Sequence, residues 1–164
     1  MPIISEIKGD IVELGKEGRY EAIVHGCNCF HTFGAGLAPQ IKKAWPEAFK
    51  ADLHTIKGDK AKLGNFSTYY DEGRDLYVFN LYTQYGFDRV AGQPDVDYLA
   101  VANAFTRLNK LVPSLTCNSP QTENNIVGIP MIGAGLAGGH WQAISTIIDL
   151  ATPDLSLELV VYNP

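Results

Sequence analysis

The pentapeptide Gly34-Ala35-Gly36-Leu37-Ala38 occurs a second time in the chain as Gly133-Ala134-Gly135-Leu136-Ala137. Each copy follows a strand-like run and opens a helical pattern. Glycines let the backbone turn tightly and approach a ligand, and a helix N-terminus offers unpaired N–H groups with a partial positive charge. One such loop alone is more often a simple turn. Two identical copies favour a pair of phosphate-binding loops.

Strand-like runs and helical patterns alternate along the chain, which predicts an α/β fold: three layers, α/β/α, around a central mixed, mostly parallel sheet. We expect strands at Ile3–Ile7, Ile11–Leu14, Glu21–His25, Phe66–Tyr70, Leu76–Tyr82, Ile126–Met131 and Leu157–Tyr162. We expect helices around Leu37–Ala44, Pro46–Ile56, Tyr98–Val112 and Trp141–Ala151, with Asp95 or Asp97 capping the third. The segments Gly86–Pro94 and Asn118–Asn125 are expected to be long surface loops.

The length of 164 residues indicates one domain over residues 1–164, and 46% hydrophobic residues can supply its core. The net charge of −5 disfavours an extended nucleic-acid partner, although backbone N–H groups can still hold a small phosphate ligand. No apolar run reaches the roughly 20 residues of a membrane span. Three cysteines without a signal sequence lead us to expect a cytoplasmic protein.

If the parallel strands end at one edge of the sheet, both loops face the same crevice and a diphosphate can lie between them. Gly133, Gly135 and Gly138 also match the dinucleotide fingerprint G-x-G-x-x-G. That fingerprint needs an acidic residue at the end of the next strand, whereas Glu158 stands at the start of that strand. We therefore expect no nicotinamide or flavin cofactor.

The segment from His25 to His31 resembles a metal site only in composition. If it is extended, the two histidines lie about 20 Å apart at roughly 3.3 Å per residue, so we expect no metal. Cys27 is interpreted as a core residue, with a nucleophile as the alternative. Asn28 can donate and accept hydrogen bonds to ribose hydroxyls, or bond its own loop backbone.

Four segments in this order resemble the macro domain family over nearly the whole chain: Gly9-Asp10-Ile11, Ala22 to Asn28, Gly34 to Ala38, and Ile129 to Gly138. The resemblance implies the macro-domain fold and ADP-ribose or ADP-ribose-1″-phosphate as ligand. By position, Asp10 would accept from the adenine amino group, the Ile11 backbone would contact the ring, and Asn28 would orient the distal ribose. Gly34, Gly36 and Leu37 would form the first phosphate loop, and Gly133, Ala134, Gly135, Leu136, Ala137 and Gly138 would surround the diphosphate.

His25 stands where many members of the family have asparagine, and in this it is similar to ADP-ribose-1″-phosphate phosphatases. An imidazole with a pKa near 6.5 suits a general acid or base, so His25 and His140 are candidate catalytic residues. Asn28 is the third, because it would fix the ribose. His31 is a further alternative, and His140 is expected in the first turn of its helix.

Another branch of the family removes ADP-ribose from carboxylate side chains with a lysine and an aspartate. This chain has Thr83-Gln84 and Ala137 at those positions. The alternatives to a phosphatase are a non-catalytic reader of ADP-ribose and a hydrolase acting on ADP-ribosylated protein or nucleic acid.

Overall fold

The computed structural model describes residues 3–88, 90, 92–116 and 126–163, and these residues contain one six-stranded sheet. The strands lie in the order β1-β6-β5-β2-β4-β3. All neighbouring strands are parallel except β3 and β4, which form an antiparallel hairpin. The strands are β1 (Ile3–Gly9), β2 (Ala22–Cys27), β3 (Phe66–Asp71), β4 (Leu76–Tyr82), β5 (Ile126–Ile129) and β6 (Ser156–Tyr162).

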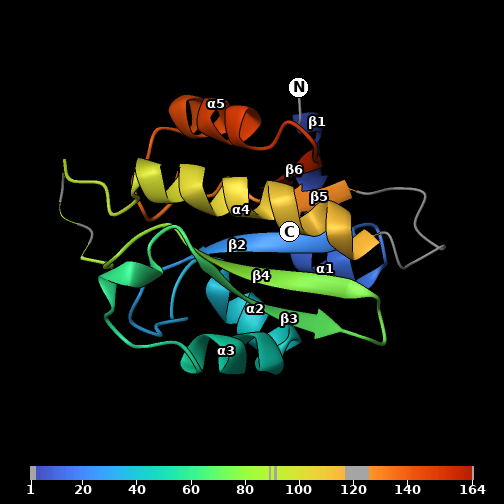
Figure 1. The fold of residues 1–164 in the computed structure, drawn as a ribbon, viewed down its shortest axis with the longest axis horizontal. Coiled ribbons are helices and arrows are strands. Elements are labelled where there is room, and N and C mark those ends of the chain that lie inside the picture. Colours follow the sequence, from blue (N-terminus) through green and yellow to red (C-terminus); the bar gives the residue numbers. More distant parts are fainter. Residues whose placement is uncertain (1–2, 89, 91, 117–125, 164) are drawn as a thin grey trace.

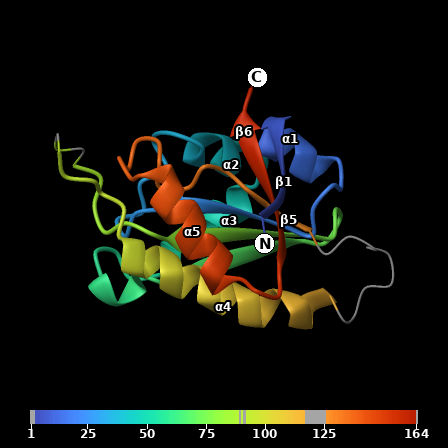
Figure 2. The ribbon, with the colours of Figure 1, turned by 90° about the horizontal axis from the view of Figure 1, so that it is seen from above.

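Helices cover both faces of this sheet. They are α1 (Ile11–Lys16), α2 (Ala38–Ala44), α3 (Pro46–Leu53), α4 (Tyr98–Thr116) and α5 (Trp141–Ala151), together with a short 3₁₀ turn η1 (Lys60–Lys62). In Figure 1, α4 and α5 lie above β2 and β4, whereas α2 and α3 lie below them. Figure 2 shows α5 and α1 on opposite sides of β1, β5 and β6. The expected three-layer α/β/α fold is thereby confirmed.

Two apolar clusters fill the space between the layers. On the side of α4 and α5, Phe105, Ile144 and Phe79 of β4 belong to one cluster of buried residues. On the other side, Ile41 of α2 and Ala48 of α3 belong to a second cluster. Alternate residues along a strand supply opposite clusters, as the pleat of a strand requires. None of the helices in the described part of the chain combines the length and apolar character that a bilayer crossing requires.

The expected strand at Ile11–Leu14 is wrong, because these residues begin helix α1. The Asp10 carboxylate accepts hydrogen bonds from the N–H groups of Val12 (2.9 Å) and Glu13 (3.4 Å). An aspartate in this N-cap position satisfies donors that the first helical turn leaves free. A short apolar run fits a strand or a helix equally well, and here the cap decides for the helix.

The helix boundaries also differ from expectation. Helix α4 continues to Thr116, through Pro113, and α3 ends at Leu53. Asp97 caps α4, since its carboxylate accepts from the Ala100 N–H at 2.9 Å. The expected surface loop at Asn118–Asn125 lies outside the described residues. The described part of the segment Gly86–Pro94 contains no helix or strand.

At the centre of the sheet, the connections that follow two neighbouring strands run to opposite faces. β2 and β5 are parallel neighbours. After β2 the chain runs to α2 and α3 on one face, and after β5 it runs to α5 on the opposite face. Two adjacent strands whose connections diverge leave a crevice at their carboxyl ends, where ligands of open α/β sheets bind.

Candidate ligand cleft

A cleft of about 550 Å³ occupies this crevice. Its volume is within the usual range for small-molecule sites, about 300–1,000 Å³. Both copies of the repeated pentapeptide contribute to its wall, so the structure brings the two glycine loops together. The residues that line it include Asn28, Thr32, Gly34, Gly36, Leu37, Gln84, Phe87, Asp95, Gly133, Gly135, Leu136 and Ala137.

The first loop leads directly into a helix. Gly36 has a φ of 66°, in the left-handed region where glycine is favoured, and Leu37 is the N-cap residue of α2. Ala38 is buried under the loop. Leu37 and Ala38, the residues at which α2 starts, line the cleft, as expected for a phosphate-binding loop.

The second loop has the same five residues but a different backbone. Gly133 and Gly138 have φ values of 74° and 73°. The chain then turns through Gly139, whose N–H donates to the Gly133 carbonyl at 2.7 Å. Helix α5 begins only at Trp141. The expectation that this copy opens its helix directly is therefore wrong.

Two glycines are not required by the fold itself. Gly34 and Gly135 have no positive φ, and a Cβ atom built on either would find no neighbouring atom within 4 Å. Both line the cleft. The missing side chains leave room where the backbone can approach a ligand closely.

The loops also contact each other across the cleft. A Cβ atom on Gly36 would lie 3.6 Å from Cδ1 of Leu136, so this leucine of the second loop lies over the first. Leu136 is 54% exposed, whereas its counterpart Leu37 packs partly against the core. The second loop thus supplies an apolar side chain to the cleft mouth.

Asn28 lies between β2 and the first loop and has its amide fixed. The Oδ1 atom accepts from the Phe30 N–H at 2.8 Å, and Nδ2 donates to Oγ1 and to the carbonyl of Thr32. These bonds order the loop that carries Asn28, and Asn28 and Thr32 both line the cleft. In this structure the Asn28 side chain therefore bonds the backbone of its own loop, which was one of the two expected roles.

His25 is almost fully buried, with 1% of its surface exposed. Its Nε2 lies 2.6 Å from Oδ1 of Asn80, whose Nδ2 donates to the Ala48 carbonyl and to Ser67 Oγ. The amide of Asn80 is thereby oriented, so Nε2 of His25 carries the proton. Burial lowers the pKa of His25 to about 4, although the bond to Asn80 opposes the shift. An imidazole with this lowered pKa is neutral near pH 7.

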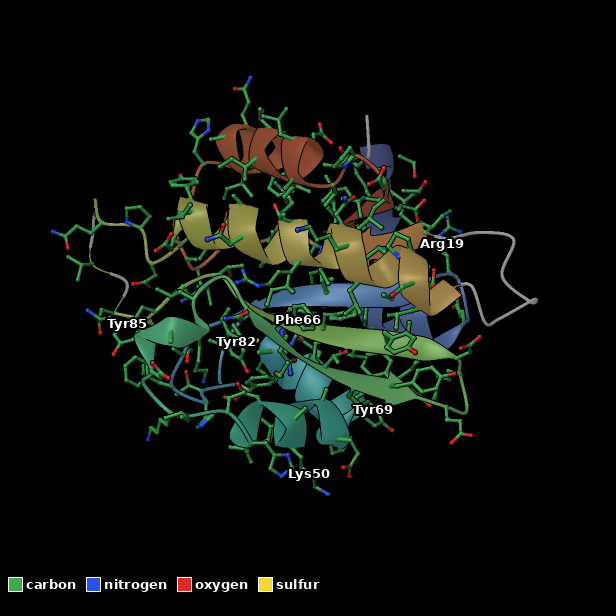
Figure 3. The ribbon with its side chains drawn as sticks, in the orientation of Figure 1. Arg19, Lys50, Phe66, Tyr69, Tyr82 and Tyr85 are labelled. Carbon is green, nitrogen blue, oxygen red and sulfur yellow. The ribbon has the colours of Figure 1, made fainter. Side chains whose placement is uncertain are left out.

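The bonds from His25 continue into a buried polar network that ends on Asp52. Ser67 and Tyr82 hydroxyls are 2.8 Å apart, and the Tyr82 hydroxyl donates to Oδ1 of Asp52 at 2.7 Å. The Nδ1 atom of His31 lies 2.9 Å from the other carboxylate oxygen. Burial raises the pKa of Tyr82. Figure 3 shows Tyr82 and Tyr85 at the same end of the molecule.

The same network holds the loop after β2. His31 has a φ of 60°, in the left-handed region, and its ring is bonded to Asp52 of α3. Lys62 is buried, its Nζ donates to the Cys29 carbonyl at 3.2 Å, and it lies 4.6 Å from the centre of the Tyr82 ring. The loop that carries Asn28 is thus tied to buried charges on two other elements.

Several expected site residues do not line this cleft. His31 turns to Asp52, and His140 is the N-cap residue of α5, outside the first turn where it was expected. Asp10 and Ile11 lie at the start of α1, where Asp10 acts as the cap. Ala134 packs partly on the core, and Gly138 lines an adjoining groove of about 330 Å³ that shares Asp95, Leu136 and Ala137 with the cleft.

Asp95 is a cleft residue that the sequence pattern assigned differently, as one of two possible helix caps. Among the described lining residues it is the one carboxylate. Its N–H donates to the Ala137 carbonyl at 2.8 Å, and a β-bridge between Gln84 and Val96 closes the base of its loop. Asp95 is therefore attached to the second glycine loop.

The surroundings of Cys27 bear on the alternative that it is a nucleophile. Cys27 is buried, and burial raises the pKa of its thiol well above the usual range, which disfavours the thiolate that a nucleophile requires. Within the described ranges, no group of three or more histidine, cysteine, aspartate or glutamate side chains is arranged to hold a metal ion.

Sequence comparisons identify relatives that align with most of this chain. An uncharacterized 17.5 kDa protein from the tk-vs intergenic region of Enterobacteria phage T4 is 39% identical over 169 residues, covering 99% of this chain and 98% of the phage protein. An ADP-ribose 1″-phosphate phosphatase from Meyerozyma guilliermondii is 26% identical and covers 90% and 93%. A DNA ADP-ribosyl glycohydrolase from Thermus aquaticus is 24% identical, and this chain spans 40% of its length. No family model matches the chain.

Comparison with solved structures agrees with these relatives. The macrodomain of Mycobacterium tuberculosis DarG superposes with a TM-score of 0.74 at 21% identity, covering 98% of this chain and 97% of the other. A three-layer fold with two glycine loops at the switch point of the sheet, together with these similarities, defines the class. The chain belongs to the macrodomain family. Within it, the chain is similar to proteins named ADP-ribose 1″-phosphate phosphatase.

Proposed function

We propose that the cleft binds ADP-ribose and that the protein is a hydrolase that releases phosphate from ADP-ribose-1″-phosphate. The observation that carries the proposal is the convergence of both glycine loops on one cleft, each with an open glycine, Gly34 and Gly135, at its wall. A diphosphate needs closely approaching N–H groups, and open glycines permit that approach. Relatives named for this phosphatase activity support the choice of substrate.

In this proposal each part of the ligand has its own contacts. The diphosphate lies between the loop of Gly34, Gly36 and Leu37 and the loop of residues 133–138. The distal ribose lies against Asn28, whose loop is ordered by Thr32 and Phe30. The adenine extends toward Asp10 and Ile11, beyond the cleft.

Asp95 is the group we propose for proton transfer. Hydrolysis adds water to the phosphorus atom, breaks the bond to the C1″ oxygen and moves one proton from water to that oxygen. A carboxylate at the cleft wall can accept the proton from water and return it to the leaving oxygen. Backbone N–H groups would stabilise charge on the phosphate oxygens. His25, which lines the cleft and is neutral because its pKa is lowered to about 4, would form part of the ribose wall, with its ring held by Asn80.

The test is phosphate release from ADP-ribose-1″-phosphate by the purified protein. Asp95→Asn should lower kcat by about 10²–10⁴ while ADP-ribose affinity stays within about threefold. Asp97→Asn is the matched control, because Asp97 caps α4 two residues away and asparagine is an equally good cap. No phosphate from the wild type between pH 5 and 8, with ADP-ribose still bound, would support the reader alternative instead.

A second candidate is hydrolysis of ADP-ribose from nucleic acid. The relative named DNA ADP-ribosyl glycohydrolase aligns with 96% of this chain. By contrast, the chain has Thr83-Gln84 near the lysine position, and Ala137 at the aspartate position, of the branch that acts on carboxylate side chains. Of these residues, Gln84 and Ala137 line the cleft. Residues of these types cannot perform that lysine and aspartate chemistry, so removal of ADP-ribose from carboxylate side chains is disfavoured.

A further inference from the structure

Thr32 is a cleft residue that the sequence motifs did not single out. It is exposed, lines the cleft and belongs to the segment between β2 and the first glycine loop. Both of its neighbours in the chain are anchored. His31 is bonded to Asp52, and Phe33 is buried with its ring centre 5.3 Å from that of His25. Thr32 is thereby held at the cleft wall between two fixed residues.

The side-chain amide of Asn28 is fully engaged as a donor within this segment. Its Oδ1 atom accepts from the Phe30 N–H at 2.8 Å, and because a backbone N–H can only donate, the other terminal atom of the amide is the nitrogen. That nitrogen carries two hydrogens. It donates to the carbonyl of Thr32 at 3.3 Å and to the Thr32 hydroxyl oxygen. Asn28 therefore has no remaining N–H for a ribose hydroxyl.

The same bonds orient the hydroxyl of Thr32. A hydroxyl has one hydrogen and two lone pairs, and one lone pair of Thr32 Oγ1 accepts the N–H of Asn28. The hydrogen bonds that Thr32 makes within the described part of the structure use its two oxygen atoms as acceptors. Because the Asn28 nitrogen lies on one side of Oγ1, the hydroxyl hydrogen points away from Asn28. The O–H of Thr32 is thus a donor that a ligand at this part of the cleft wall can use.

We propose that Thr32 donates a hydrogen bond to a hydroxyl of the distal ribose, and that Asn28 is the positioning residue that orients Thr32. The proposal rests on ADP-ribose binding as proposed above and assigns the side chain that recognises the ribose. Removing the Thr32 hydroxyl should then weaken ADP-ribose binding. Direct donation by Asn28 would have the opposite sign, because loss of the Thr32 acceptor would free an Asn28 N–H for the ligand.

The experiment compares ADP-ribose with two analogues that lack the hydroxyl at C2″ or at C3″ of the distal ribose. Calorimetry gives the Kd of each ligand, and the Kd of an analogue divided by that of ADP-ribose measures the contribution of the missing hydroxyl. All three ligands have the same diphosphate, so changes in charge or loop order that affect them equally leave this ratio unchanged. The wild type should give a ratio of about five for one analogue, as expected for a neutral hydrogen bond.

The variants separate the hydroxyl from the loop that carries it. Thr32→Val keeps the shape of the side chain, and it should weaken ADP-ribose binding about fivefold while its ratio falls to about one. Thr32→Ser keeps the hydroxyl and should keep the ratio of the wild type. In Asn28→Asp the second carboxylate oxygen can accept from the Thr32 hydroxyl, which turns the hydrogen away from the ligand, so the ratio should also fall to about one.

Thr106→Val is the matched control. Thr106 is exposed on α4, its hydroxyl donates to the Ala102 carbonyl, and neither residue lines the cleft. This variant should bind all three ligands as the wild type does.

The outcomes separate this proposal from the proposed function. A ratio of about five that persists in Thr32→Val would overturn the proposal in favour of direct donation by Asn28. Equal falls in Thr32→Val and Thr106→Val would also overturn it, as would wild-type ratios of about one for both analogues. In each of these cases ADP-ribose still binds, so the cleft assignment stands. If the wild type does not bind ADP-ribose, the cleft assignment fails and the assignment of Thr32 fails with it.

Discussion

The two glycine loops have the same five residues and adopt different backbones. In the first loop the left-handed residue is the third of the pentapeptide, Gly36, and α2 follows directly. In the second it is the first residue, Gly133, and α5 begins only after Gly139 and His140. Identical local sequence therefore does not determine the path of the chain at this site.

The two loops differ in backbone because different interactions hold them in place. The first loop follows a segment tied by hydrogen bonds to the buried carboxylate of Asp52. The second is held by close packing, because Gly133 lies against Val96 and Ile144. Glycine can adopt a left-handed conformation at little energetic cost at any of these positions. Tertiary packing determines which glycine adopts it.

The largest expected effect tests the polar support of the first loop. Asp52→Ala leaves the Tyr82 hydroxyl and the His31 ring without their buried acceptor. We expect the free energy of unfolding to fall by about 3–5 kcal/mol, measured by urea denaturation. Asp52→Asn, which can still accept from Tyr82, should lose less than half as much. Equal losses for both variants would show that charge alone, and not hydrogen bonding, supports the loop.

The next effect compares equivalent glycines of the two loops. A Cβ atom on Gly133 would lie 2.7 Å from Val96 Cγ2, and φ is 74°. Gly133→Ala should therefore cost about 2–4 kcal/mol, whereas Gly34→Ala at the same pentapeptide position should cost less than about 0.5. At the third position the order should reverse, with Gly36→Ala more costly than Gly135→Ala. Thermal unfolding of the four variants measures this pattern, and similar shifts in all four would contradict it.

Sequence periodicity was sufficient for most of the fold, because long amphipathic patterns such as Tyr98–Val112 and strands rich in β-branched residues have few alternatives. It failed at Ile11–Leu14, where the run was too short to distinguish a strand from a helix. Only the hydrogen bonds of the Asp10 cap decided that segment.

Part of the site was also predictable from a sequence pattern. The repeated glycines indicated both loops, and their meeting in one cleft follows from the adjacency of β2 and β5. Asp95 could not be separated from Asp97 as a helix cap, because its position depends on a bridge between residues 84 and 96. The pKa of His25 depends on burial between layers, which a strand-end histidine does not reveal.

The third effect concerns the open glycines. Gly135→Val and Gly34→Val each place a side chain at the cleft wall without a neighbour to displace. We expect each to weaken ADP-ribose binding by about tenfold, about 1.4 kcal/mol, in calorimetry. Thermal unfolding without ligand should change little, because both sites are exposed. Unchanged affinity in the Gly135 variant alone would limit the diphosphate contact to the first loop.

The smallest expected effect concerns His25, the histidine of β2 beside the first loop. Its folded pKa is lowered to about 4, against an ordinary value near 6.5. Between these pH values the unfolded chain binds a proton at His25 and the folded protein does not, so stability is complete above pH 6.5 and falls toward pH 4. Burial raises the pKa of Glu21 to about 7, so the effect of Glu21 on stability has the opposite sign in much of this pH window.

Comparing wild type with His25→Gln isolates the histidine, because the glutamine amide can still donate to Asn80. The variant should lose less stability than the wild type on going from pH 6.5 to 4. At pH 6–8 its phosphate release should stay within about threefold, because the proposal assigns proton transfer to Asp95, and the Nε2 proton of the neutral His25 is held by Asn80. A break in kcat/KM near pH 6.5 that disappears in the variant would instead make His25 the proton carrier and the first loop the catalytic half of the cleft.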